Sequence, residues 1–292
     1  MTILKELTNK YSKEDIETLY NKIKSVKGVA KEINCSITTT HRLFDLYNLK
    51  KIYNVGNKKH YINERYFEII DSEDKAYWLG FIMADGCVYK GTGNTYRLQI
   101  NLKASDKGHL NLFAKNIKSD YNVSTKETNN SFVSSIKINS TKLCKDLIKH
   151  GVTERKSLTC SMPNLNKSLV RHFIRGYFDG DGWITLNISE RIRKEFGICS
   201  GSIEMINNLN TYLNINYYKK RNNNLHKIVT SDTEKIKKIY KYLYENCTIC
   251  LQRKKRIFDI LIYMLDCPLI KWFIRKNLFN CGKRLRALSP KL

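Results

Sequence analysis

Apolar residues recur at helical spacing near the N-terminus, and they predict a small group of short helices. The stretch IETLYNKIKSV is amphipathic, and GVAKEIN is followed by a turn and then by TTTHRLFDLYNL. Ser36 or Thr38 would cap the last helix, which gives the spacing of a helix-turn-helix. We therefore place a DNA-binding module of this kind, with its linker, at residues 1–70; a helical packing module is the alternative. Its candidate DNA contacts are Thr39, Thr40, His41 and Arg42.

From Asp74 onward the pattern of apolar and polar positions changes, and the new pattern occurs twice. The apolar segment AYWLGFIMADGC is followed by the alternating runs YRLQINLKA and FVSSIKINST, which predict strands, and by the helical patterns KGHLNLFAKNIKSD and KLCKDLIKHGV. Asp181 lies 96 residues after Asp85, in the segment VRHFIRGYFDGDG, which opens the second series. That series contains strand-like WITLNI, EFGICS and LHKIVTS and helix-like SIEMINNLNTYL and TEKIKKIYKYLYEN.

The internal repeat of about 95 residues has the size of a half-domain and is too long for one unit of a solenoid. We predict an α+β protein with two pseudo-symmetric halves, at residues 71–162 and 163–265. The linker between them runs from Thr159 to Lys167, around Pro163. A basic C-terminal tail, 266–292, follows, and its pattern favours neither contact with phosphates nor disorder.

The first segment of each repeat carries small residues at helical spacing, as WLGFIMADG in one copy and IRGYFDGDG in the other. Gly80 and Ala84 lie four residues apart, as do Gly176 and Gly180. In a helix, each pair lies on one face, and small faces allow two helix backbones to approach closely. We therefore expect the two segments to form a pair of helices packed against each other on the pseudo-twofold axis.

Both helices are expected to end at an Asp-Gly pair. Gly86 and Gly182 would take the left-handed conformation that commonly follows a helix, which places Asp85 and Asp181 in the last turn. The partial negative charge of a helix C-terminus disfavours another anion there, so two acids packed together would repel unless a cation lay between them. One copy of such a motif is common in proteins; two copies in a repeated context point to function.

Phosphodiester hydrolysis is the chemistry that fits this pair of acids. Mg²⁺ binds through one or two carboxylates together with phosphate oxygens of a substrate, and other divalent cations bind similarly. A cation at such a site assists both the attacking and the leaving oxygen, and one acid from each half would serve the two strands of a duplex. The backbone carbonyls of Ala84 and Gly180 are candidate further ligands of the metal.

Charge and composition favour a nucleic-acid partner. The net charge of +25 repels itself in a compact chain, and a polyanion would relieve that repulsion. A generally Lys-rich composition is the alternative explanation. No apolar run approaches the roughly 20 residues of a membrane helix, and the N-terminus lacks the pattern of a secretory signal. We therefore expect an intracellular protein of a nucleoid, a phage-infected cytoplasm or an organelle matrix, with reduced cysteines. Cys247 and Cys250 form a C-x-x-C without the second pair that a zinc site needs.

The two motifs resemble the paired signatures of the LAGLIDADG homing endonuclease family, and residues 74–262 resemble its single-chain, two-repeat members. Each copy keeps the central Gly, the small residue before the acid and the acid-Gly ending. The resemblance implies two αββαββα halves whose antiparallel sheets form a saddle over the major groove. It also implies a monomer that cleaves both strands of a long DNA site with Mg²⁺ and leaves short 3′ overhangs.

The resemblance also implies roles for particular residues. Asp85 and Asp181 match the metal-binding acids of the family. Met83 stands where the family consensus has its first Asp, whereas Asp179 keeps it; that position is usually structural, so both centres are expected to be intact.

Polar and basic residues around each metal order water and stabilise phosphate charge in the family. Their matches in the first half are Gln99, Lys103 and Lys156. The second half has Gly197 in place of Gln99, and Lys254 is the counterpart of Lys156, so chemistry at the two strands is expected to be unequal. For each lysine the alternative is a solvated surface position.

Basic and aromatic residues on the predicted strands are candidates for contacts to bases and phosphates. His172, beside the second motif, is expected to be a packing residue rather than a general base. The strand candidates are Tyr96, Arg97, Lys137, Arg191, Arg193, Lys194 and Lys227.

Two alternatives of other classes remain open at the level of sequence. The first is a non-cleaving DNA- or RNA-binding protein of the same fold, such as an intron-splicing maturase whose partner is a group I intron RNA. The second is an intein, which needs a nucleophilic first residue and a terminal His-Asn. The chain begins Met-Thr and ends Pro-Lys-Leu, so an intein is not expected.

Overall fold

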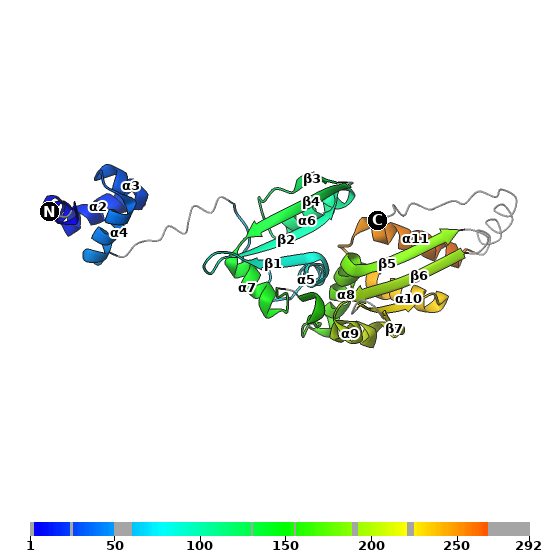
Figure 1. Ribbon diagram of the computed structural model, residues 1–292. Coiled ribbons are helices and arrows are strands. Elements are labelled where there is room, and N and C mark those ends of the chain that lie inside the picture. The colour runs from blue at the N-terminus through cyan, green and yellow to red at the C-terminus, as the bar shows by residue number, and fades with distance from the viewer. Residues whose placement is uncertain are drawn as a thin grey trace. The chain divides into compact units, whose positions relative to one another are not determined.

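The computed structural model divides the chain into two compact units, Met1–Lys59 and His60–Leu292 (Figure 1). It describes residues 3–23, 26–49, 60–129, 131–154, 156–188, 192–220 and 225–267. Arg191 and the basic tail from residue 268 onward therefore lie outside the described residues. In the described part of the chain, no helix has the length and apolar character needed to cross a membrane.

The N-terminal unit has four helices in its described residues, one more than the sequence pattern predicted. Ile16, Val29, Leu43 and Phe44 are buried at its centre. The side chain of Ser36 caps the last helix by accepting a hydrogen bond from the backbone N–H of Thr39 at 3.0 Å, which confirms one of the two predicted caps. The helices are α1 (Ile3–Lys10), α2 (Lys13–Ile23), α3 (Val26–Glu32) and α4 (Ile37–Leu46).

One of the residues predicted to contact DNA faces the interior of this unit. Thr40 is fully buried, and its hydroxyl donates to the carbonyl of Ser36 at 3.0 Å. The prediction for Thr40 is therefore wrong, because helical periodicity turns it toward the core beside Leu43 and Phe44. Thr39 is half-buried with its hydroxyl 2.8 Å from that of Ser36, whereas Arg42 is exposed.

The second unit contains two similar halves, and its order of elements is the predicted αββαββα in each. The first half consists of α5 (Glu73–Asp85), β1 (Gly86–Lys90), β2 (Tyr96–Lys103), α6 (Lys107–Asn116), β3 (Ser124–Thr128), β4 (Ser131–Asn139) and α7 (Thr141–Lys149). The second consists of α8 (Lys167–Asp181), β5 (Gly182–Ile188), β6 (Ile192–Ser200), α9 (Ile203–Leu213), β7 (Asn216–Lys220), β8 (Leu225–Thr230) and α10 (Thr233–Tyr244), followed by α11 (Gln252–Asp266). Short 3₁₀ turns occur at Ala104–Asp106 and Lys156–Leu158.

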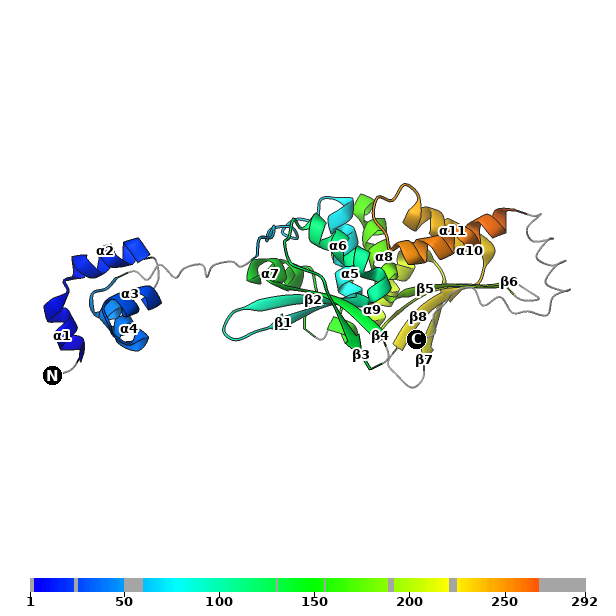
Figure 2. The same cartoon turned by 90° about the horizontal axis from the view of Figure 1, so that it is seen from above.

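Each half contributes one antiparallel sheet of four strands in the described residues, with the orders β1-β2-β4-β3 and β5-β6-β8-β7. Figures 1 and 2 show helices α5 and α8 side by side between the two sheets. The fold that the LAGLIDADG resemblance implies is therefore confirmed by topology. Ile62, Tyr66 and Phe67 are buried in the core of this unit, so residues 60–70 belong to it rather than to a linker.

Each sheet has one face toward the core and one open face. On β2, Leu98 and Ile100 are buried, whereas Arg97 before them and Asn101 after them are exposed, as the two-residue period of a strand requires. Helices α6 and α7 pack against the first sheet, and α9 and α11 against the second. The open face is the one that could meet another molecule.

The contact between α5 and α8 depends on glycine, as predicted. A Cβ at Gly80 would overlap the carbonyl oxygen of Phe173, and one at Gly176 would overlap the carbonyl oxygen of Tyr77. Near the helix ends, Gly180 lies against the side chain of Ala84. The two backbones therefore touch along the whole shared face.

The expectation of left-handed glycines after the two helices is wrong. Gly86 has φ −81° and Gly182 has φ −93°, both in the extended region, because each glycine is also the first residue of a strand. Glycine is needed there for space, since a Cβ would collide with the carbonyl oxygen of Ile82 or of Phe178 one turn earlier.

Gly176→Ala should weaken the helix pair severely, because the new methyl group has no room beside the backbone of Tyr77. We expect the free energy of unfolding, measured by urea denaturation, to fall by about 3 kcal/mol or more. Gly108→Ala in α6 is the matched control, since no atom lies within 4 Å of its Cβ position and alanine gains up to about 1 kcal/mol of helix propensity. Equal stability of the two variants would contradict this account of the helix contact.

Candidate functional site

Asp85 and Asp181 are the last residues of α5 and α8, and the helix contact brings them together. A Cβ built on Gly180 would lie 3.4 Å from Oδ2 of Asp85, so this carboxylate rests against the final turn of the opposite helix. Both acids are partly buried. The structure thus places the two predicted acids at one point, between the first strands of the two sheets.

The environment of the two carboxyl groups disfavours their charge. Burial, and then the nearby charge of Asp181, raise the pKa of Asp85 to about 6, while Lys254 and Lys156 act in the opposite direction. Burial also raises the pKa of Asp181 against the same two lysines. Two acids held in this state would gain from a cation placed between them.

Lys156 and Lys254 are buried and bind the ends of the two motif helices. The ammonium of Lys156 donates to the carbonyl of Gly86 at 2.5 Å. That of Lys254 donates to the carbonyl of Gly182 at 2.5 Å, and burial lowers the pKa of this lysine to about 8. The two lysines thus occupy equivalent places, and neither is the solvated surface residue of the alternative interpretation.

The backbone carbonyls that were candidate metal ligands already have partners. The carbonyl of Ala84 accepts from Lys156 at 3.3 Å, and the carbonyl of Gly180 accepts from Lys254 at 3.0 Å. An ammonium group at a carbonyl opposes a second cation there. The carboxylates of Asp85 and Asp181 therefore remain the groups that suit a metal ion.

Asp179 is structural, as predicted for its position. Its buried carboxylate accepts hydrogen bonds from the hydroxyls of Tyr77 at 2.8 Å and Tyr244 at 2.6 Å, and from the backbone N–H of Leu251 at 2.6 Å. These contacts fix the chain just before Lys254. Met83 fills the corresponding position of the first half with an apolar side chain.

Sequence reasoning missed an ion pair that joins the two halves. Arg175 of α8 is fully buried and donates to the carboxylate of Glu73 in α5 at 2.7 Å. It also donates to the carbonyl of Ile249 at 2.8 Å. An arginine inside an otherwise apolar helix segment was the available signal, because a buried charge needs a partner.

His172 packs beside this ion pair rather than near the acids. Its Nδ1 lies 3.0 Å from Nη1 of Arg175. Burial, and then the charge of Arg175, lower the pKa of His172 to about 4. A neutral imidazole in this place agrees with the predicted packing role.

The predicted site residues Gln99 and Lys103 of the first half lie on β2, which pairs with the strand that begins directly after Asp85. Gln99 pairs with Cys87 across β1 and β2, and its amide donates to Oδ1 of Asn101 at 3.0 Å. Lys103 is exposed at the end of the same strand. In the second half, Gly197 holds the position that corresponds to Gln99 and pairs with Trp183.

Most of the predicted strand contacts with a described position lie on the open faces. Arg97 and Lys137 are exposed on the first sheet, in register with Asn139 and Gln99 respectively. On the second sheet, Arg193 is exposed, and Lys227 pairs with Cys199 on the same face.

Two predicted DNA contacts point the other way. Tyr96 precedes Arg97 on β2 and packs against the hydrophobic core. Lys194 pairs with Leu186 and shares the core face of β6 with Phe196. The prediction for Tyr96 is therefore wrong, since adjacent residues of a strand face opposite sides of the sheet. Lys194 is only half-buried and lines a hollow at β5 and β6, so its contact with DNA stays a prediction.

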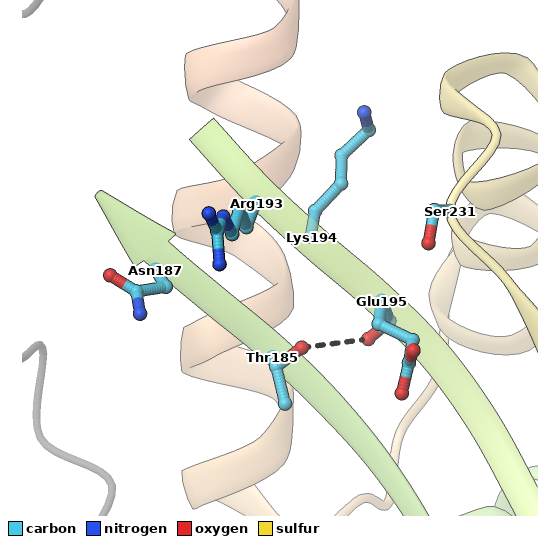
Figure 3. A pocket seen from close by; sticks show the side chains of 6 residues that line it. All are labelled: Thr185, Asn187, Arg193, Lys194, Glu195 and Ser231. Carbon is cyan, nitrogen blue, oxygen red and sulfur yellow. Dashed lines mark hydrogen bonds between the residues drawn. The ribbon is translucent and has the colours of Figure 1, made fainter. Parts of the chain in front are cut away.

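A hollow at β5 and β6 combines residues of several kinds (Figure 3). The hydroxyl of Thr185 donates to the backbone carbonyl of Glu195 at 3.5 Å, and the exposed Asn187 and Arg193 pair across the two strands. All six lining residues have polar or charged side chains. The lining consists of Thr185, Asn187, Arg193, Lys194, Glu195 and Ser231.

Comparison with family models finds no match for this chain. Among curated proteins, the chain is 27% identical over 197 residues to the "Probable translation initiation factor IF-2" of Methanocaldococcus jannaschii. The match covers 65% of this chain but only 15% of that protein.

Comparison with solved structures finds LAGLIDADG proteins at low sequence identity. The LAGLIDADG meganuclease I-AabMI, bound to uncleaved DNA, gives a TM-score of 0.49 and 14% identity, over 68% of this chain and 96% of that one. The LAGLIDADG homing endonuclease I-GzeII, in complex with its DNA target, gives a TM-score of 0.49 and 13% identity, over 70% of this chain and 97% of that one. The LAGLIDADG homing endonuclease I-SmaMI, bound to cleaved DNA, gives a TM-score of 0.47 and 15% identity, over 73% of this chain and 97% of that one.

Asp85→Asn should stabilise the metal-free protein at neutral pH. The pKa of Asp85 is raised from 3.8 to about 6, so between these values the folded chain holds a proton that the unfolded chain has released. The stability from this carboxyl is therefore full below about pH 4 and is lost as the pH rises through about 6. We expect a higher melting temperature for the variant than for the wild type, both measured in EDTA at about pH 7.5. Asp71→Asn, at an exposed surface ion pair, is the control.

Proposed function

We propose that this chain is a single-chain LAGLIDADG homing endonuclease, which hydrolyses both strands of a long double-stranded DNA site with Mg²⁺ and leaves short 3′ overhangs. The observation that carries the proposal is the meeting of Asp85 and Asp181 at the ends of two close-packed helices, between two sheets with polar open faces. One acid from each half matches the two strands of a duplex. A monomer would then cut both strands without a second copy of the chain.

The acid pair fits a divalent cation that is shared with the substrate. Among the described residues, no group of three or more His, Cys, Asp or Glu could hold a metal ion by itself. Mg²⁺ needs only one or two carboxylates when phosphate oxygens complete its shell, and burial, together with the nearby Asp181, raises the pKa of Asp85 and so disfavours its charge in the absence of a cation. A bound cation would supply Lewis-acid assistance at phosphorus and would stabilise the leaving oxygen.

The surrounding side chains have supporting tasks in this proposal. Lys156 and Lys254 hold the helix ends and so fix the two carboxylates in place. They also add positive charge near a scissile phosphate, which favours binding of the DNA backbone. Gln99 lies on the open face opposite Cys87, two residues after Asp85, and is suited to orient a water molecule by hydrogen bonding.

The open faces provide groups for both kinds of DNA contact. Arg97 and Arg193 suit bidentate contacts to guanine, and Asn139 and Asn187 suit contacts to adenine. The net charge of +25 would contribute affinity that does not depend on sequence. The N-terminal unit would add a further contact through α4, where Arg42 is exposed.

The activity can be tested on genomic DNA from a strain that lacks this reading frame, followed by sequencing of fragment ends. We expect Mg²⁺-dependent breaks at one or a few sites, and the loss of double-strand breaks in Asp85→Asn and in Asp181→Asn, because each acid is needed for the cation. Asp71→Asn should cleave like the wild type. Cleavage that survives both single substitutions would sink the shared-metal mechanism.

A maturase of the same fold would give a different result in parallel assays. Tight binding of a group I intron RNA, together with no DNA cleavage in Mg²⁺ or Mn²⁺, would replace the nuclease proposal with the RNA-binding alternative.

Arg42→Ala should weaken DNA binding if α4 docks in a major groove. We expect a loss of about 1–3 kcal/mol in binding free energy at fixed salt, measured by fluorescence anisotropy on the mapped site. Lys13→Ala, on the exposed start of α2, removes the same charge and serves as the control. Equal effects of the two substitutions would indicate that the N-terminal unit contributes only general charge.

A further inference from the structure

The open faces of the two sheets differ most at the strands beside the acid pair. The strands can be compared residue by residue, because Gly86 pairs with Ile100 in the first half as Gly182 pairs with Ile198 in the second. Three polar residues on β2 of the first half are replaced in the second half by two glycines and a cysteine. Gln99, Asn101 and Lys103 correspond to Gly197, Cys199 and Gly201.

An indole ring fills the space that a residue at position 197 would use. A Cβ on Gly197 would collide with the six-membered ring of Trp183, the residue that pairs with it. The ring nitrogen of Trp183 donates to the carboxylate of Glu195 at 2.8 Å, which holds the indole along β6. In the first half the corresponding residue is Cys87, whose small side chain leaves room for Gln99.

Positions 199 and 201 also lack a polar side chain directed to the open face, for two different reasons. The thiol of Cys199 donates to the backbone carbonyl of Asp181 at 3.4 Å, so its hydrogen-bonding capacity is directed toward the helix end. A Cβ on Gly201 would lie 2.5 Å from the backbone oxygen of Ser157 and 3.1 Å from the side chain of Leu158. The segment that follows the first half therefore occupies the place where a counterpart of Lys103 would extend.

We propose that Trp183, Gly197 and Gly201 make the catalytic centre of the second half slower than that of the first. The enzyme would then cut one strand first, and a nicked duplex would accumulate before the second strand is cut. This inference rests on the proposed nuclease function. Trp183 is the positioning residue, because its ring fills the space in which a side chain at position 197, the counterpart of Gln99, would lie.

The expected size of the difference follows from what such groups contribute elsewhere. A single hydrogen-bond donor that stabilises developing charge is worth on the order of 10²-fold in rate, and a group that only orients water contributes less. At the positions of Gln99 and Lys103 the second centre has neither the amide nor the ammonium group; its ammonium groups are those of Lys254 and of Lys227, opposite Cys199. We therefore expect the second cut to be slower by about tenfold or more.

The test uses the full-length protein and a supercoiled plasmid that carries the site mapped on genomic DNA. Wild-type protein should convert this plasmid to the nicked form before the linear form appears, and the same strand should be nicked in most molecules. Trp183→Cys combined with Gly197→Gln installs the first-half pair in the second half. It should speed the second cut and leave the first cut unchanged.

The reciprocal variant separates a local effect from loss of folding. Cys87→Trp combined with Gln99→Gly should slow the first cut by about the same factor, so that the two strands are cut at similar rates. A merely destabilised protein would lose both cuts together. Equal rates for the two strands in the wild type would overturn the inference, as would a Trp183→Cys, Gly197→Gln variant that folds and keeps a slow second cut.

A second readout needs no cleavage. Tb³⁺ binds carboxylate oxygens and emits when a nearby indole is excited, so Trp183, two residues after Asp181, should contribute a measurable share of the emission sensitised by tryptophan. Trp183→Phe should remove that share, and combined Asp85→Asn and Asp181→Asn substitutions should abolish it. Full emission from Trp183→Phe would show that the indole does not face the acid pair and would overturn its positioning role.

The two proposals fail in different ways. Absence of any strand cut by the wild type in Mg²⁺ and Mn²⁺ would refute the nuclease function. Rapid cutting of both strands at equal rates would uphold that function and refute the inferred order.

Discussion

The contact between the backbones of α5 and α8 is the constraint on which the rest of the second unit depends. Two helices approach this closely only where side chains are absent, and Gly80 and Gly176 meet that condition on opposite helices. Because each sheet begins at the residue after its helix, the same contact also fixes the sheets relative to each other. The acids at the two helix ends are therefore positioned by packing that lies between one and two helical turns before them.

That geometry creates an electrostatic problem at the helix ends. Two C-termini and two carboxylates gather at one point, all of them negative. Lys156 and Lys254 offset this charge by binding backbone carbonyls rather than by forming close ion pairs with Asp85 and Asp181. The carboxylates stay destabilised, as the raised pKa of both shows, and so remain available to a cation. The lysines thus stabilise the site without neutralising it.

The sequence predicted the architecture well because periodicity reports burial directly. The pattern of residues showed the repeat, the glycine faces and the equivalence of Lys156 and Lys254 in the two halves. Predictions failed where the outcome depended on the phase of an element, which residue type alone does not set. Tyr96 and Thr40 have suitable side chains but point toward a core. The Glu73–Arg175 ion pair joins residues about a hundred positions apart, and a sequence pattern gives no partner for either.

The comparison of the two halves shows what joining them in one chain permits. In a symmetric pair of identical subunits, a change beside one acid is repeated beside the other. Here Trp183 could enter the second half while Cys87 and Gln99 stayed in the first, and the segment after the first half could fold over Gly201. The helix contact tolerates such divergence because it needs only its small residues, and these are kept in both halves. Symmetry is therefore retained in the packing that positions the acids, whereas the groups around each acid are free to differ.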